Sequence, residues 1–500
     1  MNYVVSINNN QTLPLKDIPE QSYHAFLENN INLLKDSISR HCVNYFGFEY
    51  NGNVKLFCCI ADDSIHQIYL SSCVIGKGTT LNSFSKHNYN FEKFEREISE
   101  NYGIKYTDHP WLKPLRYSEN RVDKTKSIAN YPFLSFESEE LHEVGVGPVH
   151  AGIIEPGHFR FICNGEQILH LEIQLGYQHR GIEQLFLKKK NLLERTILAE
   201  SIAGDTTVGH TTAFVNLWES LSGFEPDEAL KFSRTLALEL ERIAIHTGDL
   251  SALCTDIAYQ LGSSVFGRLR TPIVNYFQEW CGNRIAKSLI RPGYTNFTYT
   301  PELRSRLIDL LSAYEPDFTE MVTKLFKLPS ALSRFERTGV VTLDEVKQIG
   351  TVGMAARMSG LNRDIRSSHP HDLYNKLNHQ PIIKHHGDVY SRAQIRKEEI
   401  KQSIGYVKKL TEQIPNYSKG ETKTLKPAPD SFSLSLVEGW RGEICHCAIT
   451  DAKGELILYK IKDPSFHNWL ALAQAVRNNE ISDFPICNKS FNLSYCGHDL

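Results

Sequence analysis

The chain has no C-x-x-C pair, no run of about 18 apolar residues and no excess of charge of either sign. Without such a run no segment is expected to span a bilayer, so any membrane contact has to go through partner subunits. Residues 1–17 have no basic segment followed by an apolar stretch, so no signal peptide is expected. The net charge of -3 provides no basic field for nucleic acid.

The length of 500 residues is too great for one hydrophobic core, and two or three domains are expected. The eleven cysteines are scattered and odd in number, which indicates reduced thiols in a cytosolic protein. Cys445 and Cys447 flank His446 in a strand-like run, where alternation places both thiols on one face. Burial as small hydrophobic residues is the favoured interpretation of this pair.

The first part of the chain alternates short helical and strand-like segments. Helical spacing occurs at 22–34 and 91–98, and Asn51-Gly52 predicts a hairpin turn within 44–61. The polar stretch 116–130 is the best linker in this third of the sequence. These patterns predict a small α+β domain.

The remainder combines long amphipathic helices with strands at both of its ends. Strands are predicted within 144–176, around the turn Asn164-Gly165, and again at 432–437, 442–450 and 455–462, after a Pro/Lys/Thr-rich loop at 419–430. Helical periodicity covers 182–199, 206–221, 226–261, 303–325 and 391–413. The fold class is therefore α+β, with a mainly helical bundle and peripheral β hairpins in the larger part.

Three segments place titratable groups where they could carry chemistry. The glycine- and proline-rich loop 145–158 suits proton handling by Glu155, and a capped structural turn explains it equally well. In the helix 226–261, the residues Glu239, Arg242 and His246 share one face and must either pair with a neighbouring helix or line a cavity.

The third segment is a cluster of charges beside small residues, comprising Arg357, Arg363, Asp364 and Arg366. It predicts either a hydrogen-bonded knot in the interior or an anion pocket. A surface loop is the competing interpretation.

The order of these motifs resembles that in the large subunit of membrane-bound, energy-converting nickel–iron hydrogenases and in the homologous 49 kDa subunit of respiratory complex I. The match covers residues 140–500 and consists of several motifs in the same order. They are Gly147-Pro-Val-His150 to His158-Phe-Arg160, Gly176-Tyr-x-His179-x-Gly181-Ile-Glu183, Glu241-Arg242-Ile-Ala-Ile-His246, Arg357-Met-Ser-Gly360-x-x-Arg363-Asp364-x-Arg366, Arg441-Gly442-Glu443 and Lys462-x-Pro464-Ser-Phe466.

The N-terminal part resembles a second subunit, the 30 kDa subunit of complex I. The resemblance rests on Phe94-Glu95-Arg96-Glu97, Tyr102-Gly103-Ile104 and the segment His109 to Tyr117. It implies a fused chain, with a 30 kDa-like α+β domain at 1–125 and a hydrogenase-large-subunit-like domain at 126–500.

The departures from the family concern its metal ligands. In the hydrogenases two C-x-x-C pairs hold nickel and iron through soft thiolates. The resemblance places the four ligand positions at Ala203, Thr206, Ser494 and Gly497, none of which supplies a thiolate. No nickel–iron centre and no directly bound cofactor are therefore expected.

The complex I positions that contact a quinone headgroup correspond to Ile154 and Gly204, whose side chains cannot hydrogen-bond to it. With His150 and His210 they outline a quinone-like cavity. The charged residues around that cavity are present, and the resemblance implies proton-relay or cavity roles for Glu155, His158, Asp256, Arg363, Asp364 and Arg441. Glu155 matches the proton-transfer glutamate of the hydrogenases.

The resemblance thus implies a peripheral subunit of an energy-converting oxidoreductase complex related to NADH:quinone oxidoreductase, on the cytoplasmic face of the membrane. Its implied partners are an iron–sulfur small subunit, which would carry the cluster, and membrane ion-translocating subunits. Quinone is a possible ligand. The alternatives are a structural or coupling subunit without redox chemistry, and an enzyme of another class that reuses the fold.

Overall fold

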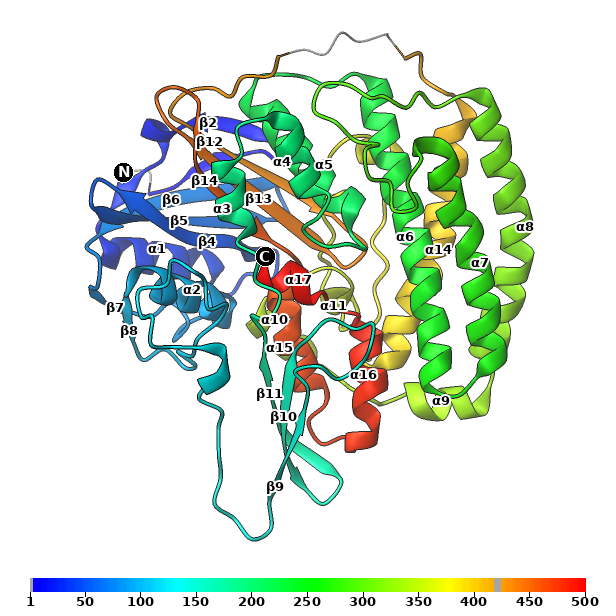
Figure 1. Cartoon of the computed structure of the whole chain (residues 1–500), viewed down its shortest axis with the longest axis horizontal. Coiled ribbons are helices and arrows are strands. Elements are labelled where there is room, and N and C mark those ends of the chain that lie inside the picture. The colour runs from blue at the N-terminus through cyan, green and yellow to red at the C-terminus, as the bar shows by residue number, and fades with distance from the viewer. Residues whose placement is uncertain (1–2, 418–423) are drawn as a thin grey trace.

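The structure is a computed structural model that describes residues 3–417 and 424–500. Helices and antiparallel sheets occupy different sides of the molecule, with the sheets on the left of Figure 1 and the long helices on the right. The predicted α+β class is confirmed. No helix in the described ranges is both long enough and apolar enough to cross a membrane.

The N-terminal part is built on a mixed sheet in the order β1-β6-β5-β4, with β3 parallel to β6. Its turn at Asn51-Gly52 has positive φ at both residues, as a two-residue hairpin requires. The sheet elements are β1 (Val5–Ile7), β3 (Glu20–Gln21), β4 (Arg40–Tyr50), β5 (Asn53–Asp62) and β6 (Gln67–Ile75). The flanking elements are α1 (Tyr23–Leu34), α2 (Glu92–Tyr102) and the parallel pair β7 (Thr80–Asn82) and β8 (Lys105–Thr107).

The second face of this sheet packs against a sheet from the far end of the chain, in the order β14-β13-β12-β2. The rings of Phe57 and Phe432 stack across the interface with centroids 5.8 Å apart. The strands are β2 (Gln11–Pro14), β12 (Ser431–Glu438), β13 (Glu443–Thr450) and β14 (Leu456–Lys462). Because β2 pairs with β12, the N-terminal segment completes a C-terminal sheet, and the division at residues 125 and 126 stays a prediction.

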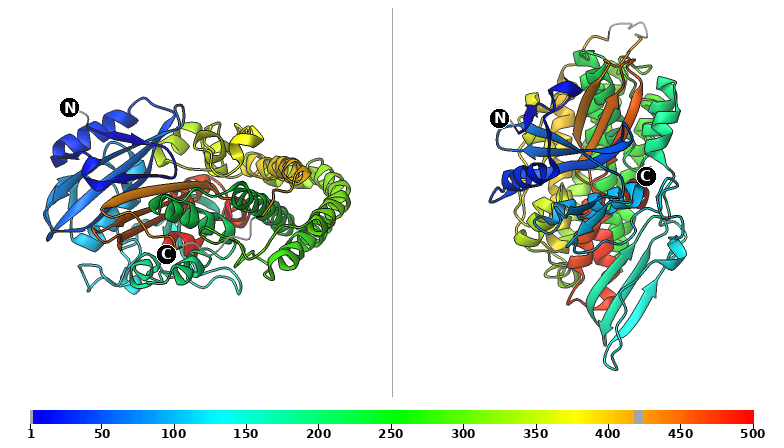
Figure 2. Two further views of the ribbon diagram at one scale, coloured as in Figure 1. Left: turned by 90° about the horizontal axis from the view of Figure 1, so that it is seen from above. Right: turned by 90° about the vertical axis from the view of Figure 1, so that its left-hand side faces the viewer.

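The helical part is a bundle of α6, α7, α8 and α14 beside these sheets (Figure 2). The helices before it and within it are α3 (Ile182–Lys188), α4 (Leu192–Ala199), α5 (Thr207–Leu221), α6 (Glu228–Asp256), α7 (Gln260–Cys281), α8 (Pro301–Leu325), α9 (Pro329–Phe335) and α10 (Leu343–Ile349). Those that follow are α11 (Met354–Arg357), α12 (Ile365–Ser368), α13 (Tyr374–Leu377) and α14 (Val389–Glu412). Part of the predicted loop 419–430 lies outside the described residues.

Two helix predictions were wrong in extent. The segment 182–199 is two helices, because the Asn191 side chain accepts a hydrogen bond from Leu193 N and starts a new helix there. The segment 226–261 ends as a helix at Asp256, and α7 begins at Gln260 after a turn with Ala258 at φ 57°.

The remaining elements place the C-terminus inside the protein. They are β9 (His142–Val146), β10 (His158–Asn164), β11 (Gln167–Gln174), α15 (Ser465–Ala475), α16 (Phe484–Phe491) and α17 (Tyr495–Asp499). Backbone N–H groups of Arg180 and Gly181 donate to the Leu500 carbonyl at 2.9 and 3.0 Å. The start of α3 and the end of the chain are therefore fixed to each other.

Candidate functional site

The glycine-rich loop between β9 and β10 lies beside the C-terminal helix. Gly157 N donates to Pro148 O at 2.9 Å and closes the loop. A side chain on Gly147, at φ 97°, would come within 2.2 Å of the Gly157 carbonyl, so only glycine fits. Glu155 accepts a hydrogen bond of 3.1 Å from Cys496 N, which ties the loop to α17.

The four vacant ligand positions are filled by protein. Ala203 and Thr206 are fully buried, and Ser494 caps α17 by accepting from Gly497 N at 2.9 Å. A Cβ on Gly497 would lie 2.6 Å from an Asp463 carboxylate oxygen, so that carboxylate takes the space of a larger side chain. These donors do not fit a nickel–iron group, and the described residues contain no cluster of three or more His, Cys, Asp or Glu side chains able to hold a metal.

Two guanidinium groups join the segments that carry these positions. Arg441 donates two hydrogen bonds of 2.6 Å to the Asp205 carboxylate, one of 3.0 Å to Thr206 Oγ1 and one of 2.5 Å to Asn492 O. Arg180 donates to the Ser201 and Ile202 carbonyls at 2.7 Å and to Cys496 O at 3.4 Å. Hydrogen bonds thus make the cross-link between the two segments.

A chain of hydrogen bonds leads from this centre through the sheet. Asp463 Oδ2 lies 3.0 Å from His210 Nε2, His210 Nδ1 lies 3.1 Å from His446 Nε2, and His446 Nδ1 lies 2.8 Å from the Tyr459 hydroxyl. All four side chains are buried. Burial lowers the pKa of His446 well below its usual value, and His210 adds to the effect, so His446 is neutral.

With Asp463 ionised and both histidines neutral, the chain has one consistent set of donors. His210 then donates to Asp463, His446 donates to His210, and the Tyr459 hydroxyl donates to His446. Such a sequence can pass a proton by reversing each bond in turn. At its far end Tyr459 lines a cavity of about 250 Å³ that also includes Glu97 and Lys460.

The charged cluster at 357–366 lies in the interior, and the surface-loop interpretation was wrong. Arg357 bonds to Asp364 at 2.8 Å, Glu399 at 2.7 Å and Glu438 at 2.9 Å, with all four side chains at most 1% exposed. The arginine, aspartate and glutamate side chains that form this network of buried ion pairs are here called the charged knot. They are Glu239, Arg242, Arg357, Asp364, Arg366, Glu399 and Glu438. The charged knot joins α6, α14 and β12.

The residues on α6 therefore pair with neighbouring elements. His246 Nε2 lies 2.8 Å from Glu399 on α14, and Glu239 accepts hydrogen bonds from Ser403 and Tyr374, both at 2.5 Å. The pairing alternative for Glu239, Arg242 and His246 is confirmed.

The structure separates the residues to which relay or cavity roles were assigned. Glu155, Arg441 and His210 lie around the vacant ligand positions, whereas Asp364 belongs to the charged knot. Asp256 is exposed at the end of α6. Arg363 turns away from the knot toward Asp63, with 3.8 Å between Nε and the carboxylate.

The four residues predicted to outline a quinone-like cavity also differ in burial and in their contacts. Ile154 is half-buried and Gly204 is exposed with open space around it, whereas His210 is fully buried. His150 Nε2 lies 3.4 Å from the Tyr495 hydroxyl. His158 is half-buried at the start of β10, and its ring lies 4.9 Å from that of Phe133.

Asp463, His446 and Tyr459 were not among the predicted site residues. Strand alternation was the available signal for His446, because it places the histidine opposite Cys445 and Cys447. Those two thiols do share a face, with 3.7 Å between the sulfurs. All eleven cysteines are free and buried, as expected of reduced thiols.

Comparisons with known proteins agree with the motif order. Residues 260–431 match the family model described as "Respiratory-chain NADH dehydrogenase, 49 Kd subunit". The chain is 27% identical to hydrogenase-4 component G of Escherichia coli, over 77% of this chain and 67% of the relative. It is 26% identical to the alpha subunit of the membrane-bound hydrogenase of Pyrococcus furiosus, over 70% and 85%. It is 27% identical to the C/D subunit of the NADH-quinone oxidoreductase of Phocaeicola vulgatus, over 74% and 76%.

Proposed function

Because the chain is similar to the complex I 49 kDa subunit and to hydrogenase subunits, we propose that it belongs to their family and is a peripheral subunit of a membrane-associated, energy-converting oxidoreductase complex. In this proposal the complex couples electron transfer to translocation of protons or other ions. The subunit works without a nickel–iron site, on the cytoplasmic side of the membrane.

One observation carries the proposal that the centre is not a hydrogenase site. Arg441 binds Asp205 and Thr206 of one ligand-bearing segment and Asn492 of the other, in the place where metals would join thiolates. A bidentate guanidinium–carboxylate pair is a strong, directional cross-link. The segments therefore keep a fixed relation without metal.

The Asp463-His210-His446-Tyr459 chain supports a role in moving protons. It starts against Gly497, one of the vacant ligand positions, and ends at a cavity. Glu155 accepts a hydrogen bond from Cys496 N, one residue before Gly497, and exchanges protons with the same centre through water. Relay through these groups replaces a path through Asp256 and Arg363, which lie apart from them.

Two variants test the relay in the reconstituted complex. Glu155→Gln and Tyr459→Phe each remove one proton-carrying group with little change of shape, and each should lower ion translocation per electron transferred. His24→Gln, an exposed histidine change on α1, is the control and should leave that ratio unchanged. An unchanged ratio in both variants would refute the relay and leave the subunit assignment standing.

An iron–sulfur small subunit is the proposed direct partner. The loop that carries Glu155 exposes two large apolar side chains, Val149 at 80% and Ile153 at 98%, and such residues gain free energy when a partner covers them. Ile153→Asp should reduce co-purification of an iron–sulfur protein with this chain. Ile65→Asp, at an exposed turn far along the N-terminal sheet, should not. Equal recovery with both variants would contradict this docking surface.

The proposal also includes a specific ligand, a quinone bound near Ile154 and Gly204. The side chains of Ile154 and Gly204 have no hydrogen-bonding group, so a quinone headgroup at these positions would bond to the main chain or to the adjacent carboxylates of Glu155 and Asp205. Photo-crosslinking of the intact complex with a quinone analogue tests this, and labelling confined to other subunits would reject it.

A coupling subunit without redox chemistry is the second candidate. The close packing of Asp463 against Gly497 favours it, because the centre then has little room for a reacting group. The test is the double variant Arg441→Met, Asp205→Asn, which removes the ion pair between these two residues. If the complex that contains this variant transfers electrons at the full rate, no step of electron transfer depends on the centre and this candidate is supported.

A further inference from the structure

A basic cavity opens where the N-terminal sheet meets the helical part, away from the vacant ligand positions. It encloses about 500 Å³ between the end of α1, the start of β4, residues 85–90 and α10. Four permanent cations line it, namely Arg40, Lys86, Lys347 and Arg363, against one carboxylate, Asp36. The remaining lining residues include neutral hydrogen-bonding groups on Ser37, Ser85, Asn88, Asn90 and Gln348.

The cation at the base of this cavity is incompletely paired. Arg363 is 4% exposed, and its Nη1 donates to Thr351 O at 3.0 Å. Its Nε has no hydrogen-bond partner among the described residues, and the nearest carboxylate oxygen, on Asp63, is 3.8 Å away. Burying a guanidinium that lacks a full set of hydrogen bonds costs free energy, because the group has lost its water. An anion bound in the cavity would offset that cost.

The cations at the rim are free to turn toward a ligand. Lys347 is exposed, and its only ion pair among the described residues is a 3.8 Å contact with the exposed Asp344. Lys86 pairs with Asp108 at 2.7 Å, but both side chains are more than half exposed, so exchanging that partner for a ligand costs little. Arg40 is the exception, because the buried Asp62 already neutralises it.

The walls of the cavity are held in place by a buried side chain. Asn90 donates to the carbonyls of Lys347 and Gln348 at 3.4 and 3.2 Å, and is 4% exposed. A Cβ on Gly350 would lie 2.0 Å from the Asn90 side-chain oxygen, so the loop 85–90 and α10 approach as closely as glycine permits. Lys86 and Lys347, on opposite walls, therefore keep a fixed separation at the backbone.

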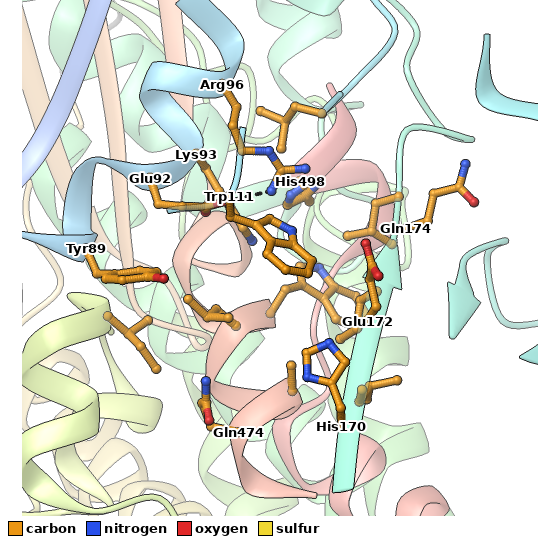
Figure 3. A pocket seen from close by; sticks show the side chains of 18 of the residues that line it. Tyr89, Glu92, Lys93, Arg96, Trp111, His170, Glu172, Gln174, Gln474 and His498 are labelled. Atoms are coloured by element: carbon orange, nitrogen blue, oxygen red, sulfur yellow. Dashed lines mark hydrogen bonds and ion pairs between the residues drawn. The ribbon is translucent and has the colours of Figure 1, made fainter. Parts of the chain in front are cut away.

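A second cavity of similar volume serves as a comparison for how the charged residues of the basic cavity are paired. That cavity lies between α2, β11 and α15 (Figure 3), and its volume is also about 500 Å³. Two of its charged side chains are paired, since Arg96 binds Glu92 at 2.7 Å and the Glu172 carboxylate binds Lys113 at 2.6 Å, while Lys93 donates to the Phe466 carbonyl. The basic cavity differs in that the ion pairs of Lys86 and Lys347 are with exposed carboxylates, while the Arg363 guanidinium lies 3.8 Å from the Asp63 carboxylate and is not hydrogen-bonded to it.

We propose that the basic cavity binds a small, soluble anion that carries phosphate groups, through Arg363 at its base and Lys86 and Lys347 at its rim. A phosphate group offers several acceptor oxygens and more than one negative charge, which matches cations on separate walls better than a single carboxylate does. Tyr89, 40% exposed, lines this cavity as well as the second one and provides a ring on which the organic part of such a ligand can stack. The site is independent of the subunit role proposed above.

Calorimetric titration of the full chain with inorganic pyrophosphate and with ADP tests the proposal. We expect saturable binding of one pyrophosphate per chain, and tighter binding of ADP if Tyr89 stacks on the base. Lys86→Gln and Lys347→Gln should each weaken binding by about ten-fold, and Arg363→Gln by about a hundred-fold, as expected for loss of charge-assisted hydrogen bonds. Lys77→Gln, an exposed lysine of the same part of the chain, should leave binding unchanged.

Two results would overturn the proposal. Absence of saturable pyrophosphate and ADP binding would reject the site, and binding that survives Lys86→Gln and Lys347→Gln together would place it elsewhere. Those two variants are at exposed side chains, so they remain informative if Arg363→Gln does not fold. Vesicles containing phosphatidylglycerol form a further arm, and binding to them without binding of pyrophosphate would assign the cavity to a lipid headgroup and reject a soluble ligand.

Discussion

Glu399 is the residue on which the charged knot depends most. Its Oε1 accepts from Arg357 at 2.7 Å and from Arg366 at 2.8 Å, and its Oε2 lies 2.8 Å from His246 and 3.5 Å from Arg242. Burial opposes its ionisation, but the three arginines hold the pKa of this carboxyl well below its usual value. The carboxylate is therefore charged in the folded protein at neutral pH.

Glu399→Gln keeps the shape of the side chain and removes that charge. Three fully buried guanidinium groups then lose their shared acceptor, and an amide cannot accept from all of them. Removing one partner of a buried ion pair costs about 3–5 kcal/mol, because the other charge stays buried. Asp364 and Glu438 still contact Arg357, so the upper part of that range is a ceiling.

The thermal midpoint gives the measurable size of this effect. With about 2.1 cal/mol/K per residue, a chain of 500 residues has an unfolding entropy of about 1 kcal/mol/K. The variant should therefore unfold about 3–5 °C below the parent if the whole chain unfolds together. The shift grows to roughly twice that if the helical part unfolds alone, since that part has about half the residues.

Calorimetry of the purified full chain, with Glu320→Gln as control, decides the matter. Glu320 makes an exposed ion pair with Lys324 on α8, and its loss should change the midpoint by less than about 1 °C. If Glu399→Gln shifts the midpoint no more than the control does, the knot does not hold α6, α14 and β12 together and the reasoning is wrong.

Three other predictions concern the knot and the vacant positions. Burial, with Asp364 beside it, raises the pKa of Glu438 from 4.5 to about 7, so the folded protein keeps a proton that the unfolded chain releases and stability falls as pH rises through this window. Glu438→Gln should flatten that fall of the thermal midpoint between about pH 5 and 7, and an unaltered slope would count against it. Gly497→Ala should cost about 1–3 kcal/mol because its methyl group meets Asp463, whereas Gly204→Ala, in open space, should be neutral in the same urea titrations. Metal analysis of protein made with added nickel should find far less than one nickel per chain, and stoichiometric nickel would reverse the assignment of the ligand positions.

Local patterns predicted the secondary structure well where the chemistry is local. Asn51-Gly52 turns a hairpin because the conformation of such a turn is set by two residues. The second hairpin turns one residue later than predicted, at Gly165-Glu166, because Asn164 is still in β10 and pairs with Gln167. The break at Asn191 was missed because apolar spacing continues through it, and the cap that starts α4 is a single side-chain hydrogen bond. The helix α7 was not predicted as a separate element, because the helical spacing of apolar residues in α6 continues to residue 261, past the start of α7.

The sequence predicted which segments form the candidate site, but it did not predict the hydrogen bonds between their side chains. Motif order placed Arg441, His210 and the vacant positions near each other, and the structure brings them together. Asp463 and Tyr459 are far along the chain from His210, so no spacing rule reveals them. The separation of Arg363 from Asp364, adjacent in sequence, follows from the backbone, since Asp364 is extended at φ -152° and directs neighbouring side chains to opposite sides.

That separation changes what the retained charges can say about function. Arg357, Asp364 and Arg366 hold α6 and α14 against β12, and this packing role does not depend on a redox centre. Their presence therefore cannot distinguish a working site from a coupling subunit. Arg441 and Asp463 are different, because they bind the very segments that would carry the metal ligands. The chemistry of this subunit should accordingly be sought in the bonds of those two residues, and in the basic cavity beside Arg363, rather than in the charged knot.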